Sequence, residues 1–363
     1  MRLLIDIGHP AHVHLFKHFA WEMQAKGHEV FFTCREKEFE IYLLEKYGFT
    51  YRSFGKKYSS KIGKLWGLIE FDLKEIYAGL DFKPDIFLSH GSMYAAQAAF
   101  LLRKPHISLE DTFNLEQVNL YKPFTQAILT ADYDHPLKSE KVIPYSGYHE
   151  LAYLHPNRFT PDKSVLDELG VNENEKYVIM RFVSWEATHD AGHKGISMEN
   201  KIRAVREFEK YARIFITSEA SPPGELHKYK ITIAPDRIHD AVAFSSLIYG
   251  ESATMASEGA VLGTPGIYLD NTGRYYTRQQ EVDYGLVFNF TESDDDQKRS
   301  IQKGLDILRE KKPSCIWAAK REQMLKDKID TTAFLVWFVE NYPKSFKIMK
   351  ENPAYQQRFK CIV

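Results

Sequence analysis

Hydrophobic positions along the chain follow two periods in turn. Residues 2–8 form an apolar run that stops at a glycine, and residues 14–27 then place apolar side chains three and four positions apart. Such a run followed by helical spacing predicts a buried strand and then a helix. The same alternation predicts further strands at 28–35, 84–91, 105–110 and 126–132, with a helix at 94–104.

The alternation stops at a polar, turn-rich segment, residues 146–175, which has room for one short helix. It then resumes and predicts strands at 176–184, 213–219, 230–235, 247–250, 265–269 and 285–290, with helices at 200–212, 238–246 and 254–263. From residue 294 onward the chain is expected to be helical and charged. Strands that alternate with helices favour parallel sheets covered on both faces.

We therefore expect an α/β protein with two Rossmann-like, doubly wound domains. The predicted boundaries are an N-terminal domain at 1–150, a linker at 151–175, a C-terminal domain at 176–330, and helices at 331–363 that pack back on the first domain. Open sheets of this kind bind ligands at the carboxyl ends of their strands. The expected site is accordingly a cleft to which both domains contribute.

Composition limits the classes of function. The net charge of −1 over 363 residues offers no broad basic face for nucleic acid. Three widely spaced cysteines predict no disulfide framework and fit a reducing cytoplasm. An aspartate interrupts the first apolar run too early for a signal peptide. Residues 55–71 combine lysines with aromatic and aliphatic residues, so they can form either a solvated helix or a peripheral contact with the inner face of a membrane.

Polar residues follow several predicted strands of the first domain. A loop and helix start come after the first strand, where free N–H groups suit an anion. His12 is the preferred histidine there for catalysis or phosphate contact, although His14 and His18, one helical turn apart, leave a zinc site open. The candidate substrate contacts of this domain are Gly8, His9, His90 and Ser92.

The adjacent carboxylates Glu110 and Asp111 follow another predicted strand of this domain. Such a pair can act as a general base or bind sugar hydroxyls, and it can equally be a solvated loop pair. Ser92 has a comparable alternative, because serine often caps the helix that it precedes.

In the second domain, the end of the strand predicted at 176–184 and the loop that follows it hold an unusual mixture of polar groups. Arg181 can bind a diphosphate through two parallel hydrogen bonds, Ser184 can contact substrate, and His189 is a candidate acid or base.

Small residues dominate the turn and helix that begin at Gly250. Here Ser252, Ala253 and Thr254 allow a phosphate to approach the backbone closely. Glu258 follows about one turn later, and its carboxylate can accept two hydrogen bonds from a ribose diol. Donors for sugar hydroxyls come from Arg278, Gln279 and Gln280. The competing interpretation is a capping turn that precedes a surface glutamate.

These motifs resemble the GT-B superfamily of nucleotide-sugar enzymes. The segment from Gly250 to Gln280 resembles the lipid II-forming GlcNAc transferase, whose second domain has a small-residue turn, a ribose-binding Glu, a Gly-x-Pro turn and an Arg-Gln-Gln sequence. Residues 84–92 and 105–111 resemble the non-hydrolysing UDP-GlcNAc 2-epimerases. There Glu110 matches the catalytic Glu, whereas Ser92 stands where those enzymes have a catalytic Asp.

The resemblance implies a glycosyltransferase that uses a nucleotide sugar, with UDP as the expected nucleotide, in the assembly of surface glycan or polysaccharide. The acceptor would be a glycan or a lipid-linked sugar, and neither a metal nor another cofactor is expected. A 2-epimerase and a nucleotide-sugar-binding protein without turnover are the alternatives. A nicotinamide dehydrogenase is disfavoured because no G-x-G-x-x-G follows the first strand.

Overall fold

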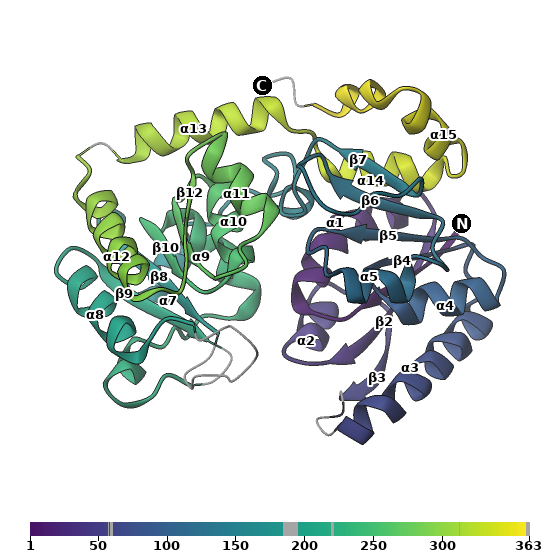
Figure 1. The fold of residues 1–363 in the computed structure, drawn as a ribbon, viewed down its shortest axis with the longest axis horizontal. Helices are drawn as coiled ribbons and strands as arrows, with labels where there is room; N and C mark the ends of the chain where they lie inside the picture. The colour runs from purple at the N-terminus through teal and green to yellow at the C-terminus, as the bar shows by residue number, and fades with distance from the viewer. Residues whose placement is uncertain (57, 59–60, 184–194, 219–220, 312, 361–363) are drawn as a thin grey trace. The chain divides into compact units, whose positions relative to one another are not determined.

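A computed structural model describes residues 1–56, 58, 61–183, 195–218, 221–311 and 313–360. The chain divides into two compact units (Figure 1). Unit 1 comprises Met1–Tyr153 and Lys328–Val363, and unit 2 comprises Leu154–Asp327. Each unit is an α/β sandwich around one parallel sheet.

Unit 1 contains a seven-stranded sheet in the order β3-β2-β1-β4-β5-β6-β7. Its strands are β1 (Arg2–Ile7), β2 (Glu29–Glu36), β3 (Tyr51–Lys56), β4 (Ile86–His90), β5 (His106–Glu110), β6 (Ala127–Ala131) and β7 (Val142–Tyr145). Its helices are α1 (Pro10–Ala25), α2 (Glu40–Lys46), α3 (Lys61–Phe82), α4 (Met93–Leu101), α5 (Leu115–Tyr121), α14 (Thr331–Glu340) and α15 (Lys344–Glu351), with a 3₁₀ segment at Pro353–Phe359.

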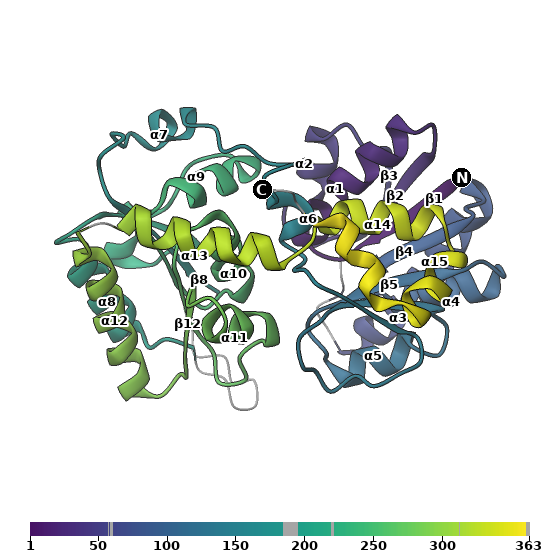
Figure 2. The same ribbon diagram turned by 90° about the horizontal axis from the view of Figure 1, so that it is seen from above.

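The strands of unit 1 are apolar because helices cover both faces of the sheet. Helices α1, α2 and α14 lie on one face and α3, α4 and α5 on the other (Figure 2). Leu4 and Phe87 of the sheet pack under α3 and α4, in a cluster with Phe71 and Ala95. Parallel strands that are buried on both faces read as continuous apolar runs rather than alternating ones.

Unit 2 contains a five-stranded parallel sheet in the order β12-β11-β10-β8-β9. Its strands are β8 (Tyr177–Phe182), β9 (Arg213–Ser218), β10 (Leu247–Gly250), β11 (Gly266–Leu269) and β12 (Val287–Phe290). Its α-helices are α7 (Ser164–Leu169), α8 (Met198–Phe208), α9 (Ile238–Phe244), α10 (Ala253–Leu262), α11 (Tyr275–Val282), α12 (Asp294–Arg309) and α13 (Pro313–Asp327); α6 (Leu151–Leu154) lies at the junction of the units, and 3₁₀ turns occur at Gly224–Tyr229 and Pro235–Arg237.

The predicted α/β class and the doubly wound sheets are confirmed by this architecture. The strand predicted at 230–235 is wrong, because only Lys230 forms an isolated bridge, with Ile216 of the edge strand β9. Alternating apolar residues do not distinguish a strand from an extended segment that finds no continuous partner. Residues 146–175 contain two short helices, α6 and α7, in place of the single helix expected.

Helices α14 and α15 belong to unit 1 and are tied to the segment after β7. The Thr331 hydroxyl donates to the Tyr148 carbonyl (3.0 Å), and the Thr332 hydroxyl donates to the Ala152 carbonyl (2.7 Å). The Ile329 N–H donates to the Ser146 carbonyl (2.8 Å). The polypeptide that returns from unit 2 therefore fixes residues 146–152 at the carboxyl end of β7.

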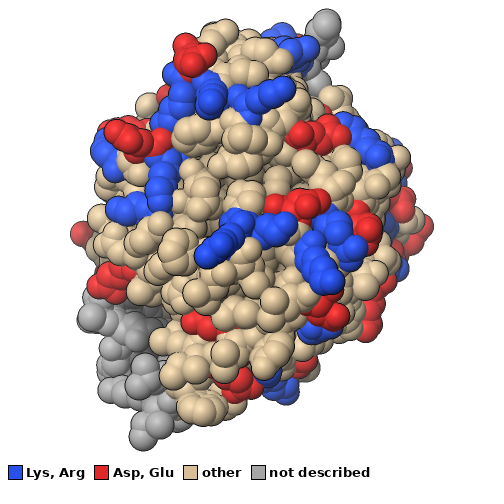
Figure 3. Space-filling view, turned by 90° about the vertical axis from the view of Figure 1, so that its right-hand side faces the viewer, with Lys and Arg blue, Asp and Glu red and all other residues tan. Residues whose placement is uncertain are grey.

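Within the described residues, none of the helices combines the length and the apolar character that crossing a bilayer requires. On the face of unit 1 in Figure 3, acidic and basic residues are interspersed, and no single sign of charge covers the surface.

Candidate functional site

Each sheet has one point where the strand order reverses, and polar residues gather at both points. In unit 1 this point lies between β1 and β4, and in unit 2 it lies between β8 and β10. The connections leave such neighbouring strands in opposite directions, so a crevice opens at their carboxyl ends. Many of the predicted site residues lie near the carboxyl ends of these four strands or directly after them.

The loop after β1 is shaped by histidine contacts with the backbone. His9 caps α1 by accepting a hydrogen bond from the Ala11 N–H at Nδ1 (3.2 Å). The Gly8 N–H donates to Nδ1 of His12 (3.3 Å), and a side chain at Gly8 would meet the Arg35 guanidinium. Because Nδ1 of His12 is an acceptor here, the neutral ring carries its proton on Nε2. His12 therefore presents a donor at Nε2, which suits contact with a phosphate or an acceptor oxygen but does not favour catalysis as a general base.

A buried ion pair supports this loop from below. The Arg35 guanidinium binds both carboxylate oxygens of Asp6, each at 2.8 Å, and Thr33 donates a third hydrogen bond to that carboxylate. Both charged side chains are almost fully buried. The pair fixes the carboxyl ends of β1 and β2 relative to each other.

Beside this loop, four side chains form what we call the histidine cluster: His12, His90, Asp111 and His149. The His12 and His90 rings lie 4.6 Å apart. Nε2 of His90 is 2.9 Å from Oδ1 of Asp111, and Nδ1 of His149 is 3.0 Å from Oδ2 of the same residue. The cluster joins the ends of β1, β4, β5 and β7, which are far apart in the sequence.

Charge is distributed unevenly in the histidine cluster. Burial, together with the neighbouring His90 and His9, holds the pKa of His12 well below its ordinary value. Burial alone would lower the pKa of His90, but the Asp111 carboxylate outweighs it and raises that pKa to about 9. Burial would raise the pKa of Asp111, but His149 and His90 hold it well below its usual range. Near neutral pH His12 is therefore neutral and His90 is protonated, and Asp111 is an anion in contact with His90 and His149.

Glu110 is used for local structure. One oxygen accepts the N–H groups of Thr112 and Phe113, both at 2.8 Å, and the other accepts the Tyr121 hydroxyl (2.7 Å). The residue is 3% exposed. Because both oxygens are occupied by the turn and by α5, the geometry does not favour the predicted role of Glu110 as a base.

Two further predicted residues of unit 1 have structural contacts. The Ser92 hydroxyl caps α4 by accepting a hydrogen bond from the Ala95 N–H (3.3 Å). His14 is buried and stacks on Tyr153, with ring centroids 5.7 Å apart. The described part of the chain brings no third histidine, cysteine or carboxylate ligand to His14 and His18, so it does not support the zinc alternative at that position.

The turn from β10 into α10 has the geometry expected of a phosphate site. Gly250 adopts a φ of +145°, and a Cβ there would lie 2.0 Å from the Arg181 carbonyl oxygen, so no other residue fits. Ser252 caps the helix through the Met255 N–H. The N–H groups of Ala253 and Thr254 have no hydrogen-bond partner among the described residues. A helix that starts this way offers donors and a positive dipole end.

Glu258 lies further along α10 and is 5% exposed. Its Oε1 is 2.9 Å from Nε2 of His239 on α9, in a contact that is itself buried. The competing interpretation of Glu258 as a surface residue is therefore wrong. A ribose diol would have to share this carboxylate with His239.

The residues after β8 are only partly described. Arg181 is half-buried and donates to the Thr217 hydroxyl (3.2 Å). Ser184 and His189 lie outside the described residues. On α11, Arg278 is exposed, Gln279 is half-buried, and Gln280 is fully buried with its amide donating to the Ser257 hydroxyl (2.7 Å). Gln280 thus fastens α11 to α10 in this structure.

Two polar groups at these strand ends were absent from the residues predicted from sequence. His149 follows β7, and no local motif marks it. Glu251 directly follows Gly250 and accepts the N–H groups of Val183 (2.8 Å) and Ile196 (2.7 Å). Its Oε1 also lies 3.1 Å from Nζ of the buried Lys201. A charged residue that directly follows a buried strand was the available signal for Glu251.

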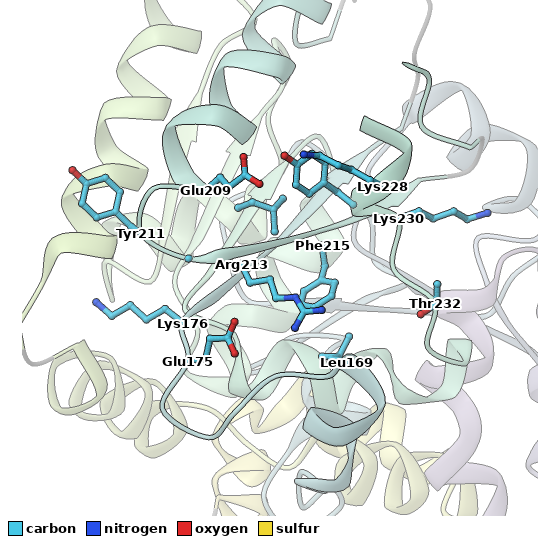
Figure 4. Close-up of a pocket in the computed structure, with 13 residues that line it drawn as sticks. Leu169, Glu175, Lys176, Glu209, Tyr211, Arg213, Phe215, Lys228, Lys230 and Thr232 are labelled. Carbon is cyan, nitrogen blue, oxygen red and sulfur yellow. The ribbon is translucent and has the colours of Figure 1, made fainter. Parts of the chain in front are cut away.

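A cavity of about 730 Å³ lies elsewhere in unit 2, at the amino end of β9 (Figure 4). Lys176, Arg213, Lys228 and Lys230 line it, together with aromatic and acidic side chains. Lys176 donates to the Leu308 carbonyl and Arg213 to the Gly170 carbonyl. Lys176 and Arg213 are thus bound to backbone carbonyls. The cavity also lies at the opposite end of the strands from Gly250, so it is not part of the candidate site.

Solved structures of several nucleotide-sugar enzymes resemble the whole chain. The UDP-GlcNAc 2-epimerase of Neisseria meningitidis bound to UDP-GlcNAc superposes with a TM-score of 0.67 at 17% identity, covering 98% of this chain and 100% of that one. MnaA of S. aureus, solved with UDP, gives 0.69 at 14% identity, covering 95% and 97%. The spinosyn forosaminyltransferase SpnP gives 0.63 at 14% identity, covering 96% and 99%.

The similarity to both epimerases and a glycosyltransferase confirms the GT-B class of fold expected from the sequence. No curated protein matches the chain by sequence. The family model described as "Protein of unknown function (DUF354)" matches residues 1–312, and the chain therefore belongs to the DUF354 family.

Proposed function

We propose that this protein is an enzyme that uses a nucleotide sugar, with UDP as the expected nucleotide, and that it transfers the sugar to an acceptor. The main support is the turn from β10 into α10, where Gly250 brings the backbone close to β8 and two N–H groups at the start of the helix have no partner among the described residues. This turn lies at the reversal of strand order in unit 2, where sheets of this type bind ligands.

In this proposal the diphosphate binds the first turn of α10, and Glu258 binds the ribose. Small residues at 252–254 leave room for the phosphates, and the helix dipole favours their charge. Arg181 lies near the end of the adjacent strand β8 and pairs directly with Gly250 in the sheet register. An arginine in this position can stabilise a departing diphosphate.

The ionisable chemistry is assigned to the histidine cluster of unit 1. Nε2 of His12 can donate a hydrogen bond to the oxygen of an acceptor there, and the Asp111 carboxylate orients the neighbouring His90 ring. Transfer is preferred to 2-epimerisation because the residues at the two positions that correspond to the epimerase acid and base make structural hydrogen bonds here. Ser92 caps α4, and Glu110 is held by a turn and a tyrosine.

The nucleotide assignment can be tested with one pair of variants. Thr254→Asp places a carboxylate where the phosphate should bind, and a negative charge in the first turn also favours the helix, so folding should be preserved. Thr254→Asn has the same shape without the charge. Calorimetric titration with UDP, GDP, CDP and UDP-GlcNAc should show at least tenfold weaker binding for Asp than for Asn. Equal binding to both variants would place the phosphate elsewhere.

Incubation of the wild-type protein with UDP-GlcNAc alone separates the two reactions. Appearance of the C2 epimer in the NMR spectrum, with no acceptor present, would favour the epimerase. Release of UDP only when a sugar acceptor is added would support the transferase. Tight nucleotide binding without turnover would support the binding-protein alternative.

A lipid-linked acceptor would place the protein at a bilayer surface, and we propose α3 as the contact. Its exposed apolar residues follow helical spacing and include Trp66 (61% exposed) and Tyr77 (67% exposed), residue types that favour the membrane interface. Flotation with anionic vesicles should be lost on Trp66→Ser and Tyr77→Ser, whereas absence of flotation by the wild type would indicate an acceptor in solution.

A further inference from the structure

We infer that His90, Asp111 and His149 form a binding site for one divalent transition-metal ion of the zinc class. Nε2 of His90, Nδ1 of His149 and a carboxylate oxygen of Asp111 all lie within 4.8 Å of one another. The two nitrogen–oxygen contacts measure 2.9 and 3.0 Å. Ligand atoms that share a zinc ion at about 2.0–2.2 Å from the metal lie roughly 3–3.5 Å apart. An ion could therefore be accommodated with small movements of the side chains.

The three ligands are held by separate elements of unit 1. His90 is the last residue of β4, Asp111 directly follows β5, and His149 lies in the segment after β7. The Thr112 hydroxyl donates to Oδ1 of Asp111 (3.0 Å), which is the kind of second contact that orients a metal-binding carboxylate. The arrangement is thus built into the sheet edge rather than into one mobile loop.

The segment that carries His149 is fixed by the C-terminal helices. A Cβ on Gly147 would lie 2.7 Å from Oγ1 of Thr331, so these two segments of the chain approach too closely for a larger residue at position 147. The Thr331 hydroxyl also donates to the carbonyl of Tyr148, which directly precedes the histidine. Helix α14 therefore fixes the backbone on which the third ligand stands, so a metal would find it already in position.

The ligand set indicates the class of ion. Two imidazoles and one carboxylate suit zinc, cobalt or nickel better than magnesium or calcium, which prefer oxygen ligands alone. The side chains of His90 and Asp111 are 13% and 19% exposed, whereas His149 is 7% exposed. Three protein ligands with a remaining opening to solvent are typical of a catalytic zinc site, in which the metal polarises a bound oxygen.

The inference departs from the metal-free chemistry implied by the GT-B resemblance, and it stands independently of the nucleotide assignment. All three ligands belong to unit 1, whereas α10 belongs to unit 2. A failure to bind metal would leave the Thr254 experiment unaffected. The competing explanation is that two hydrogen bonds hold the same three side chains together without any ion.

The test uses untagged full-length protein treated with a chelator. Calorimetry with Zn²⁺ should give one equivalent of binding, and Co²⁺ should produce visible absorption bands of a four- or five-coordinate ion. His149→Gln and His90→Gln should each weaken Zn²⁺ binding by at least tenfold and abolish the Co²⁺ bands. His227→Gln is the matched control, since this histidine is exposed and belongs to unit 2.

Circular dichroism of each variant, compared with the wild type, shows whether folding is retained. A Co²⁺ spectrum that remains that of the hydrated ion in the wild type would overturn the inference. Zn²⁺ binding that is equally tight in His149→Gln and in the control would also overturn it, because the ion would then bind other residues.

Discussion

Replacement of Gly250 by alanine should be far more costly than an ordinary glycine substitution. The added Cβ would lie 2.0 Å from the Arg181 carbonyl oxygen and 2.9 Å from the carbonyl carbon. The backbone φ of +145° also belongs to a region that is essentially restricted to glycine. The β8–β10 ladder must open locally, and the hydrogen bond from the Glu251 N–H to the same carbonyl (2.9 Å) would be lost.

The magnitude follows from these three effects. Backbone strain costs about 1–3 kcal/mol, a lost hydrogen bond about 0.5–1.5 kcal/mol, and overpacking about 1–3 kcal/mol. Together these ranges give a loss of roughly 3–7 kcal/mol in the free energy of unfolding of unit 2 for Gly250→Ala. It should also abolish nucleotide binding, because the first turn of α10 is displaced.

Gly273→Ala is the matched control. Gly273 also has a positive φ (+66°), but no atom lies within 4 Å of the position of its added Cβ. That substitution should cost only the left-handed backbone penalty of about 1–2 kcal/mol. Urea unfolding followed by circular dichroism measures both variants. Equal losses would refute the reasoning, because they would mean that the β8–β10 contact relaxes freely around a methyl group.

Three other substitutions test buried polar contacts. Burial lowers the pKa of His106 to about 3, so as the pH falls below 6.5 the unfolded chain takes up a proton that the folded protein does not. The free energy of unfolding should therefore fall by about 2 kcal/mol between pH 6.5 and 5. Urea unfolding at several pH values should show a flatter profile for His106→Gln, and an unchanged profile would contradict this. Arg35→Met should cost about 3–5 kcal/mol by leaving Asp6 buried without its charged partner, and less when Asp6→Leu is added, as thermal unfolding can measure. Glu251→Gln should accelerate hydrogen exchange at the Val183 and Ile196 N–H groups, which donate to the Glu251 carboxylate. Unchanged protection would show that other contacts hold these two amides.

The sheets were largely predictable because their strands are buried on both faces. The runs at β1, β4, β5 and β8 are apolar enough to be recognised without knowledge of their neighbours. Strand β7 is four residues long and contains a proline, so its sequence carries little strand signal, and only pairing with β6 defines it. The error at 230–235 has the converse cause, since its alternation found no continuous partner strand.

The positions of the candidate residues followed from the sequence, but their partners did not. Placement after strands brought His12, His90 and Asp111 to one edge of the sheet, as expected for parallel strands. His149 joins them from 38 positions beyond Asp111, and nothing local indicates that contact. Glu110 reads like a reactive carboxylate until the hydrogen bonds from the following turn are known. Glu258 similarly depends on a histidine 19 positions earlier.

Glu251 has a consequence for how this part of the chain can change over evolution. Its carboxylate accepts hydrogen bonds from the backbone N–H groups of Val183 and Ile196 and forms an ion pair with Lys201, although these residues are 50 to 68 positions away. No single replacement can satisfy all three, so substitutions at these places should be strongly non-additive. In a comparison of DUF354 sequences, positions 251 and 201 should covary. A chimera of two family members that exchanges β8 without β10 should be less stable than either parent protein.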